Sequence, residues 1–587
     1  MNAYLIKYAL TVHILCTSTM AFSQEANGRI HLNQAGFYPA WPKIAVVAGK
    51  ADATVFYVIT VDKRDTVFSG PLSAEKQSLN SATVTKIADF SAYTHKGNYV
   101  ISIPGVGSSY PFAITENVHA PLSAAVLKAF YFQRSNTPLP AEYASKWARP
   151  AGHADTDVLI HPSAASGKRA ANTRIASPGG WYDAGDYNKY IVNSGITMGT
   201  LLSAFEDFPA YFHGCTTGIA ESRDAVPDIL NEIIYNLRWM LTMQDPEDGG
   251  VYHKLTNAAF DGMVMPGVTT APRYVVQKGT AATLDFAAVC AQAARIIKKF
   301  DNQLPGLADS CINAALRAWD WAKKNPNLVY SQRSINERFD PDISTGEYGD
   351  RQFSDEWLWA ATELFATTHS RPFYDTIVAR MKDPVPLPSW ANVAMLGYYS
   401  LVRQRDLLPG YSVPLVKQMR DSILAIADAY LSKISSSAFA TVMGQSRRDF
   451  VWGSNAVAAN QGILLITAYF LSNDKKYVYA AAGNLDYILG RNATGYCFVT
   501  GAGAKSPMHP HHRPSEADGI PEPVPGLLAG GPNPGRQDKC NYPFTEPEMA
   551  YIDEACSYAS NEIAINWNAP LVYLVSAIEA ISIAIAE

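Results

Sequence analysis

The sequence has little charge and no clusters of basic residues. Charged residues make up 17% of the 587 residues, the net charge is −5, and Lys and Arg are scattered along the chain. Nucleic-acid-binding proteins concentrate positive charge on one face, so this distribution argues against nucleic acid as a partner. Hydrophobic residues reach 48%, which is enough for a sizeable core and excludes a largely disordered chain.

The sequence also lacks an obvious repeat of 20–50 residues, which argues against a solenoid. It contains no C-x-x-C spacing either. Beyond residue 23 its cysteines are far apart, at positions 215, 290, 311, 497, 540 and 556. Disulfides are permitted in an exported protein, but no pairing follows from these positions, and Cys290 on an apolar segment fits a reduced, buried thiol equally well. The final stretch "APLVYLVSAIEAISIAIAE" carries Glu579 within it. We expect a buried core helix there rather than a transmembrane segment.

Residues 1–23 have the pattern of a secretory signal peptide. Lys7 precedes an apolar run that ends near Cys16, and "AFS" at 21–23 supplies the small residues of a cleavage site. Leu15 stands before Cys16 where lipid attachment requires a small residue, so soluble export is favoured over a lipid anchor. The sequence therefore predicts a periplasmic, cell-surface or extracellular protein.

The rest of the chain divides into two regions of different period. Residues 28–115 contain short runs rich in Val, Ile, Tyr and Thr, separated by turn residues about every ten positions, which predicts a small β-sandwich. Residues 119–587 have a helical period, and the short connection predicts that the two domains dock. Helices are expected near 120–134, 194–208, 225–244, 280–300, 305–324, 353–368, 371–382, 389–404, 413–434, 452–472, 474–489 and 565–585. Twelve helices in one domain suggest an (α/α)6 barrel, a ring of six inner and six outer helices.

The first candidate site is "GGWYDAGDYNKY", residues 179–190, which places Asp183 and Asp186 three positions apart among aromatic residues. Asp and Gly are common in surface turns, so an ordinary turn is one interpretation. The other is a carboxylate pair that activates water. Hydrolysis of a glycosidic bond with inversion needs such a base and, across the bond, a carboxylic acid.

Two further motifs supply candidates for the rest of such a site. In "YIDEACSYASNEIAINWNAP", residues 551–570, Glu562 lies just before a predicted helix among apolar neighbours, which would keep a carboxyl group protonated. A helix-capping glutamate is the alternative. "KSPMHPHHRPS", residues 505–515, provides His511 and Arg513. Zinc binding is one interpretation of this loop, but no Cys or carboxylate stands at a ligand spacing beside it. A set of donors for sugar hydroxyls fits equally well.

Together, these motifs resemble those of the glycoside hydrolase family 9 cellulases. In "DAGDY" the resemblance assigns the catalytic base to Asp186 and the carboxylate that helps to hold the water to Asp183. The segment 551–569 is similar to the family's C-terminal signature, which assigns the general acid to Glu562 and a supporting carboxylate to Asp553. "CFVTGAGAKSPMHPHHR" resembles the histidine signature and implies that His511 and Arg513 bind sugar. This signature begins here with cysteine, a departure from the family's usual Ser, Thr or Val.

The resemblance extends over nearly the whole chain and implies further site residues. It places substrate contacts at His253, Trp390, Trp452 and Trp567. It implies a calcium site in some members at Asp355 and Glu356, for which a salt bridge or helix cap is the alternative. The N-terminal region resembles the immunoglobulin-like module of one branch of the family. Residues 134–156 contain no cysteine, so the zinc site of that branch is expected to be absent.

These observations predict an exported, inverting endo-β-1,4-glucanase whose partner is a β-glucan and whose chemistry needs no cofactor. The first alternative is an exo-acting enzyme that releases cellobiose, glucose or glucosamine from chain ends. The others are a carbohydrate-binding protein that has lost catalysis and a zinc enzyme built on the histidine loop. Whether the glucan is cellulose, mixed-linkage glucan or xyloglucan, and how the chain oligomerises, is left open by the sequence.

Overall fold

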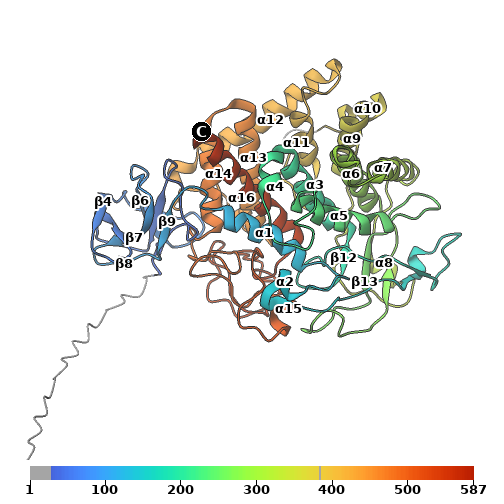
Figure 1. Ribbon diagram of the computed structural model, residues 1–587, viewed down its shortest axis with the longest axis horizontal. Helices are drawn as coiled ribbons and strands as arrows, with labels where there is room; N and C mark the ends of the chain where they lie inside the picture. The colour runs from blue at the N-terminus through green and yellow to red at the C-terminus, as the bar shows by residue number, and fades with distance from the viewer. Residues whose placement is uncertain (1–27, 382–384, 587) are drawn as a thin grey trace, which may run out of the picture.

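The structure is a computed structural model that describes residues 28–381 and 385–586. The predicted signal peptide, residues 1–23, lies outside the described residues. Within them the chain forms a small β domain and a large helical domain that lie side by side (Figure 1). The order of these two regions and their secondary structure confirm the predicted fold class.

The β domain is a sandwich of two antiparallel sheets. One sheet has the strand order β1-β2-β6-β5, and the other has the order β4-β3-β7-β8 with β9 paired to β7. Phe37, Phe56, Phe90 and Ile101 are buried between them, which explains the alternation of apolar and polar residues along the strands. The strands are β1 Ile30–His31, β2 Ile44–Ala48, β3 Val55–Thr60, β4 Thr66–Pro71, β5 Lys76–Gln77, β6 Val84–Asp89, β7 Gly97–Ile103, β8 Gly107–Ser108 and β9 Phe112–Ile114.

The helical domain contains all twelve predicted helices, and most of their bounds agree to within a few residues. Six form the inner ring: α3 Ile191–Asp207, α6 Thr280–Ile297, α9 Ser354–Thr368, α11 Ala394–Arg403, α13 Ser454–Ser472 and α16 Ile565–Ala586. Six pack outside them: α1 Ala120–Phe132, α5 Asp228–Thr242, α7 Leu307–Lys324, α10 Arg371–Arg380, α12 Val413–Leu431 and α14 Lys475–Ile488. Four shorter helices lie in the connections: α2 Ala141–Ala144, α4 Pro209–Gly214, α8 Gln332–Asn336 and α15 Arg513–Ala517.

The difference between inner and outer helices follows from their sequences. Nearly every residue of α6 is buried, which matches its apolar composition on all faces, whereas α7 buries one face and exposes the other. Small residues let the inner helices approach closely. A side chain at Gly199 of α3 would lie 2.5 Å from the ring of Trp359 on α9.

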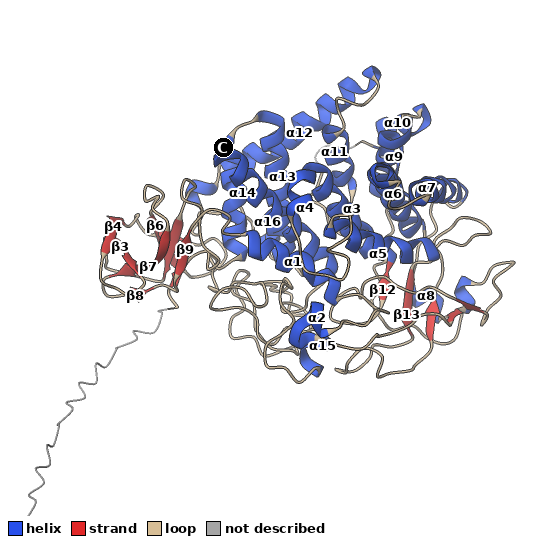
Figure 2. Cartoon of the chain, viewed as in Figure 1, coloured by secondary structure: helices blue, strands red, loops and turns tan. Residues whose placement is uncertain are grey.

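Among residues 28–381 and 385–586, two helices, α6 and α16, are long and apolar enough to cross a membrane. In the most apolar 18-residue stretch of each helix, 94% of the residues are buried for α6 and 78% for α16. Figure 2 shows both helices surrounded by other helices of the large domain. Such burial is what a core helix requires, in agreement with the prediction for the last segment of the chain.

The β domain docks on the barrel through buried polar contacts. The Tyr38 hydroxyl donates to the Glu579 carboxylate of α16 at 2.5 Å, and the His119 N–H donates to the same carboxylate at 3.1 Å. Asn33 donates to Asp486 of α14 at 2.7 Å. These buried hydrogen bonds fix the domain in place and confirm the expected docking.

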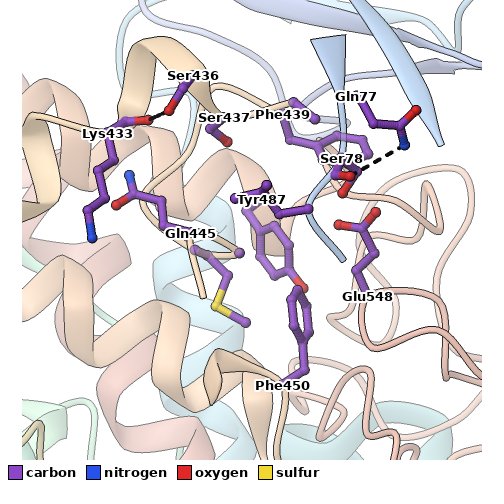
Figure 3. Close-up of a pocket in the computed structure, with 14 residues that line it drawn as sticks. Gln77, Ser78, Lys433, Ser436, Ser437, Phe439, Gln445, Phe450, Tyr487 and Glu548 are labelled. Atoms are coloured by element: carbon purple, nitrogen blue, oxygen red, sulfur yellow. Dashed lines mark hydrogen bonds between the residues drawn. The ribbon is translucent and has the colours of Figure 1, made fainter. Parts of the chain in front are cut away.

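The turn between β5 and β6 makes a second set of docking contacts. The Asn80 amide donates to the Gly444 carbonyl at 2.6 Å, and the Thr85 hydroxyl donates to the Ala438 carbonyl at 2.7 Å. A pocket of about 50 Å³ remains beside these contacts (Figure 3), where Ser78 of the β domain lies across from Glu548 of the large domain. The turn is therefore held between two loops of the large domain.

A five-stranded sheet within the long loops was not predicted. Its order is β11-β10-β14-β13-β12, and its strands have only two to four residues, too few for a pattern of alternation to be recognised. The strands are β10 Val158–Ile160, β11 Arg174–Ile175, β12 Lys189–Tyr190, β13 Lys254–Asn257 and β14 Arg273–Val275. Strand β12 leads directly into α3, so this sheet supports the turn of residues 179–190 that holds the candidate base, which we call the base turn.

Candidate active site

The stretch 179–190 is a buried turn rather than a surface turn. The Trp181 and Tyr182 side chains are buried, and Asp183 is 1% exposed. Gly180 has a φ of +82°, and a side chain there would lie 2.7 Å from the Trp239 ring. Glycine is therefore required for the turn to pack against α5.

Each aspartate of the turn accepts hydrogen bonds from its own pair of donors. The Asp183 carboxylate accepts from the Asn193 amide at 2.8 Å and from the Tyr348 hydroxyl at 2.7 Å. The Asp186 carboxylate accepts from the Asn188 amide at 2.5 Å and from the Tyr190 hydroxyl at 3.3 Å. Four donors thus fix the orientation of both carboxylates, which a group that positions a reacting water requires.

The electrostatics of the pair favour one shared negative charge. Burial, followed by the nearby charge of Asp186, raises the pKa of Asp183 to about 8. Two carboxylates this close do not ionise together easily, because the second charge is opposed by the first and by the loss of water. The pair therefore carries one negative charge near neutral pH, as a single general base requires.

Glu562 lies on the other candidate segment, immediately before α16. Burial, followed by the charges of Asp186 and Asp183, raises the pKa of Glu562 well above its ordinary value. The carboxyl group consequently keeps its proton at neutral pH, which is the state of a general acid. Although 376 residues separate Asp186 from Glu562 along the chain, backbone contacts bring their two segments together.

Backbone contacts join the two segments. The Ile565 N–H donates to the Asp183 carbonyl at 2.9 Å, and His511 pairs with Glu562 in a parallel bridge. Gly185 lies against the His511 carbonyl so closely that a Cβ at residue 185 would be 2.1 Å from that oxygen. Since α3 and α16 are neighbours in the inner ring, the segments preceding them meet at one end of the barrel.

The predicted sugar-binding pair on the histidine loop makes extensive contacts within the protein. Arg513 donates to the Gly185 carbonyl at 2.8 Å and, through Nε and Nη2, to the Asp261 carbonyl at 3.0 and 2.9 Å. The His511 ring contacts the Ala555 carbonyl at 2.6 Å through Nδ1. These contacts hold the loop against the base turn, and direct sugar binding by either residue stays a prediction.

Asp553, to which the resemblance assigns a supporting role, contacts the histidine loop. Its carboxylate accepts the Met508 and His509 N–H groups at 2.8 and 2.9 Å, together with the Asn561 amide at 3.0 Å. It therefore fixes the start of the histidine loop. Nothing in this arrangement points to a direct contact with substrate.

His253 and Trp390 support Tyr348 rather than presenting open surfaces. His253 is 1% exposed, stacks on Tyr330 at 3.9 Å, and contacts the Glu347 carbonyl at 2.7 Å. Trp390 packs edge-on against Tyr348, with ring centroids 5.4 Å apart. Both residues position the tyrosine that donates to Asp183, and substrate contact by either stays a prediction.

Trp452 and Tyr558 form an exposed aromatic surface at residues 551–570, the segment that contains Glu562 and that we call the acid segment. Trp452 is 42% exposed and Tyr558 is 36% exposed, and their ring centroids are 5.7 Å apart. Tyr558 also contacts the His511 ring at 5.8 Å. Trp567 lies beneath this region, packed on Gly453, where a Cβ would lie 2.4 Å from its Nε1. The two exposed rings have the apolar surface on which a sugar face can stack.

Several residues of the site were missed by sequence reasoning. Tyr348, Asn193 and Asn188 carry no local motif that assigns them a role. Asn193 is a buried amide on the apolar helix α3, and a buried polar residue of this kind is the signal that points to a specific partner. Tyr348 comes from a loop 165 residues after Asp183, so only the fold brings the two side chains together.

Asp355 and Glu356 lie in the first turn of α9. The Asp355 carboxylate accepts the Val393 N–H at 2.9 Å. The Glu356 Oε2 and Asn392 Oδ1 atoms are buried without a hydrogen-bond partner. Among residues 28–381 and 385–586, no group of three or more His, Cys, Asp or Glu side chains is arranged to hold a metal ion. A calcium ion here would need carbonyl or amide oxygens in addition to carboxylates.

The cysteines sort into one pair and four thiols among the described residues. Cys540 and Cys556 form a disulfide close to the acid segment. Cys215, Cys290, Cys311 and Cys497 are free, and the last three are buried. The reduced, buried state considered for Cys290 is therefore the one observed.

The (α/α)6 barrel and the grouping of Asp183, Asp186 and Glu562 at one end of it are features of a glycoside hydrolase. The family model for glycosyl hydrolase family 9 matches residues 120–575, and that for the cellulase N-terminal ig-like domain matches residues 25–108. The chain belongs to glycosyl hydrolase family 9.

Relatives and solved structures agree with this membership. A xyloglucan-specific endo-beta-1,4-glucanase of Bacteroides ovatus is 43% identical over 583 residues, which cover 99% of this chain and 98% of that protein. Endoglucanase D of Acetivibrio thermocellus is 35% identical, covering 94% of this chain and 83% of that protein. A solved structure described as Bacteroides ovatus GH9 superposes with a TM-score of 0.91 at 42% identity, covering 95% of this chain and 100% of that one.

Proposed function

We propose that this enzyme hydrolyses internal β-1,4 bonds of a β-glucan with inversion, and that xyloglucan is its preferred glucan. The observation that carries the chemistry is the grouping of Asp183, Asp186 and Glu562, in which the acid keeps its proton and the aspartate pair carries one charge. The preference for xyloglucan rests on the 43% identity to a xyloglucan-specific enzyme along nearly the whole chain.

In the proposed reaction, Asp186 removes a proton from a water molecule as the water oxygen attacks the anomeric carbon. Asp183 holds the water in place. Glu562 donates its proton to the glycosidic oxygen, the bond from that oxygen to the anomeric carbon breaks, and the configuration at this carbon is inverted. Asp186 ends protonated and Glu562 ends ionised, so one exchange of protons with solvent restores the enzyme. No cofactor takes part.

The contacts of the carboxyl groups suit these roles. The donors on Asp186 hold it in one orientation, so little reorganisation accompanies proton abstraction. The burial of Glu562 destabilises its ionised form, so the carboxyl group still carries its proton at neutral pH when the leaving oxygen needs one. Both conditions hold for a bond placed between the two segments.

A substrate panel with product sizing tests the proposal. Xyloglucan, mixed-linkage glucan and carboxymethylcellulose are digested, and proton NMR follows the anomer released first. The proposal expects a rapid fall in polymer length, α-configured new reducing ends and the highest kcat/KM on xyloglucan. Release of a single short product from the start would instead support the exo alternative. Absence of hydrolysis would support a binding protein, and loss of activity with chelators that zinc restores and calcium does not would support a zinc enzyme.

We also propose that the protein is exported. The support is the signal-peptide pattern of residues 1–23 and the size of the substrate, because a polymeric glucan must be met outside the cytoplasm. Cell fractionation, with mass determination of the mature N-terminus, tests this. A mature chain that begins at Gln24 is expected, and a lipid on Cys16 would contradict soluble export.

A structural calcium ion at Asp355 and Glu356 is a further proposal. The unpartnered oxygens of Glu356 and Asn392 and the carboxylate of Asp355 are the hard donors that calcium prefers. Burial raises the pKa of both carboxyl groups, which a bound cation would reverse. Thermal melting with calcium and with a chelator tests the proposal, with a higher Tm expected in calcium. An Asp355→Asn variant whose Tm still responds to calcium would contradict it.

A further inference from the structure

A large groove lies between the β domain and the helical domain, away from the catalytic carboxyl groups. Its volume is about 820 Å³, within the range of sites that bind small ligands. Both domains contribute to its walls. The β domain supplies residues 28–29, 31, 48–50, 77 and 81–84, and the helical domain supplies 493–494, 496, 505, 543–544, 546, 549 and 551–553. We call it the interdomain groove.

The walls combine exposed aromatic surface with amine, amide and hydroxyl groups. Phe544 is 48% exposed, and Tyr496 is half-buried with the Lys505 amine 4.2 Å from its ring centroid. Lys50 and Gln77 lie on the opposite wall, and both are exposed. A sugar has an apolar face and a rim of hydroxyls, so it needs this combination of flat rings and polar groups.

The wall around Lys505 is held rigidly by both domains. The Lys505 amine donates to the Thr494 carbonyl at 2.8 Å, and its backbone N–H donates to the Gln34 amide oxygen at 2.9 Å. Gln34 belongs to the β domain, and its own amide donates to the Gly495 carbonyl at 3.0 Å. The groove is therefore preorganised by the docking of the two domains, and a ligand would pay little to order it.

The groove also shares a wall with the active site. Asp553 lines the groove, and its carboxylate accepts the N–H groups of Met508 and His509, which start the histidine loop. His511 on that loop is bridged to Glu562. The groove and the active site are therefore connected through the short segment from Met508 to His511.

We propose that the interdomain groove is a second glucan-binding site, which takes a segment of β-glucan oligosaccharide beside the active site. Phe544 provides the stacking surface, and Lys50 and Lys505 provide donors for hydroxyls. The proposal rests on the proposed function for its choice of ligand. Its physical consequence is tighter retention of long chains, since two linked sites hold one polymer more strongly than either alone.

Direct binding tests the groove without relying on turnover. A Glu562→Gln enzyme is titrated with cellohexaose and with a xyloglucan oligosaccharide by calorimetry, and the protected segments are located by hydrogen–deuterium exchange. Two binding events are expected, with protection at 48–50 and 543–553 in addition to 183–190. Phe544→Ala should weaken the groove event about fivefold or more, and Lys50→Glu should weaken it without any risk to the core.

The matched control is Phe470→Ala, which removes a phenylalanine of similar exposure, 41%, from α13. It should leave both binding events intact. In the active enzyme, Phe544→Ala should raise KM for polymeric glucan and leave kcat/KM for a short oligosaccharide unchanged.

A single binding event at the active site in every variant, or protection that never reaches 543–553, would overturn the proposal. If hydrolysis of glucans proceeds normally while groove binding is absent, the groove proposal alone is wrong. If no glucan is hydrolysed or bound at the active site, the proposed function is wrong, and the exchange data at 543–553 still decide the groove.

Discussion

The base turn, residues 179–190, and the acid segment, residues 551–570, surround their carboxyl groups with different numbers of hydrogen-bond donors. Asp183 and Asp186 together accept four side-chain hydrogen bonds, which compensate a buried negative charge. Glu562 is half-buried, and the main influences on it are loss of water and the charges of the two aspartates. Donors stabilise an ionised carboxylate and burial stabilises a protonated one. The proposed base and acid therefore differ in the donors around them, although burial raises the pKa of both Asp183 and Glu562.

Removing the reacting carboxyl groups is the strongest way to break this contrast. Asp186→Ala and Glu562→Gln should each lower kcat by about 10³-fold on a polymer, because each loses one proton transfer. A substrate with a good leaving group, such as a dinitrophenyl cellobioside, needs little protonation and should restore much of the Glu562→Gln rate. Azide should restore the Asp186→Ala rate by replacing the activated water.

Rescue must be specific if the roles are assigned correctly. Restoration of Glu562→Gln by azide, or of Asp186→Ala by the activated substrate, would reverse the assignment of base and acid. Near-normal rates of either variant on a soluble glucan would remove that residue from the mechanism altogether. Circular dichroism on both variants confirms that the fold is retained.

Asp183→Asn separates the charge of the base turn from its shape. We expect kcat to fall by about 10²-fold, since the water loses one of its two carboxylates while the partners Asn193 and Tyr348 remain. The free energy of unfolding of this variant should instead exceed that of the wild type at high pH. The folded-state pKa of Asp183 is about 8 and its ordinary value is 3.8. The protonated carboxyl group therefore stabilises the fold at low pH, and this stabilisation is lost as pH rises through this range.

The asparagine variant should therefore gain stability relative to the wild type as pH increases from about 4 to 8. We expect a gain of about 1–3 kcal/mol at pH 8, seen as a Tm higher by about 2–5 °C, and little difference near pH 4. Thermal melts across this pH range measure it. Equal Tm differences at both ends would show that Asp183 does not retain a raised pKa.

Gly185→Ala tests whether the two segments must touch. The new Cβ would lie 2.1 Å from the His511 carbonyl, which forces apart the base turn and the loop bridged to Glu562. A displacement of about 1 Å is expected to cost roughly 10²-fold in kcat. Gly262→Ala is the matched control, because a Cβ there meets nothing within 4 Å. Equal activities of the two variants would show that this contact is not needed for alignment.

The sequence predicts the fold, and it singles out Asp183, Asp186 and Glu562 as candidates, because these signals are local. The periodicity of the α6 and α16 segments, the alternation of the β domain and the motif around Asp186 each lie within about twenty residues. Tyr348, Asn193 and the Gly185–His511 contact depend on segments brought together only by the ring of helices. The small sheet was missed because its strands are too short to show a period. His253 matches a sugar-contacting position of the family, but only the structure shows that its ring is buried against Tyr330.

Tyr348→Phe should have the smallest effect and gives the finest test of how the base turn is tuned. The substitution removes the 2.7 Å hydrogen bond to Asp183 and keeps the ring that packs against Trp390 and Tyr190. That hydrogen bond lowers the pKa of Asp183, so its loss should raise this pKa further and shift the pH profile of kcat/KM toward higher pH. We expect kcat at neutral pH to fall by about 2–12-fold, which corresponds to the loss of one ordinary hydrogen bond of about 0.5–1.5 kcal/mol. A Trp390→Phe variant keeps the hydroxyl and disturbs only packing, so it should lower activity without shifting the profile. If both variants leave the profile in place, Tyr348 positions the turn but does not tune its charge.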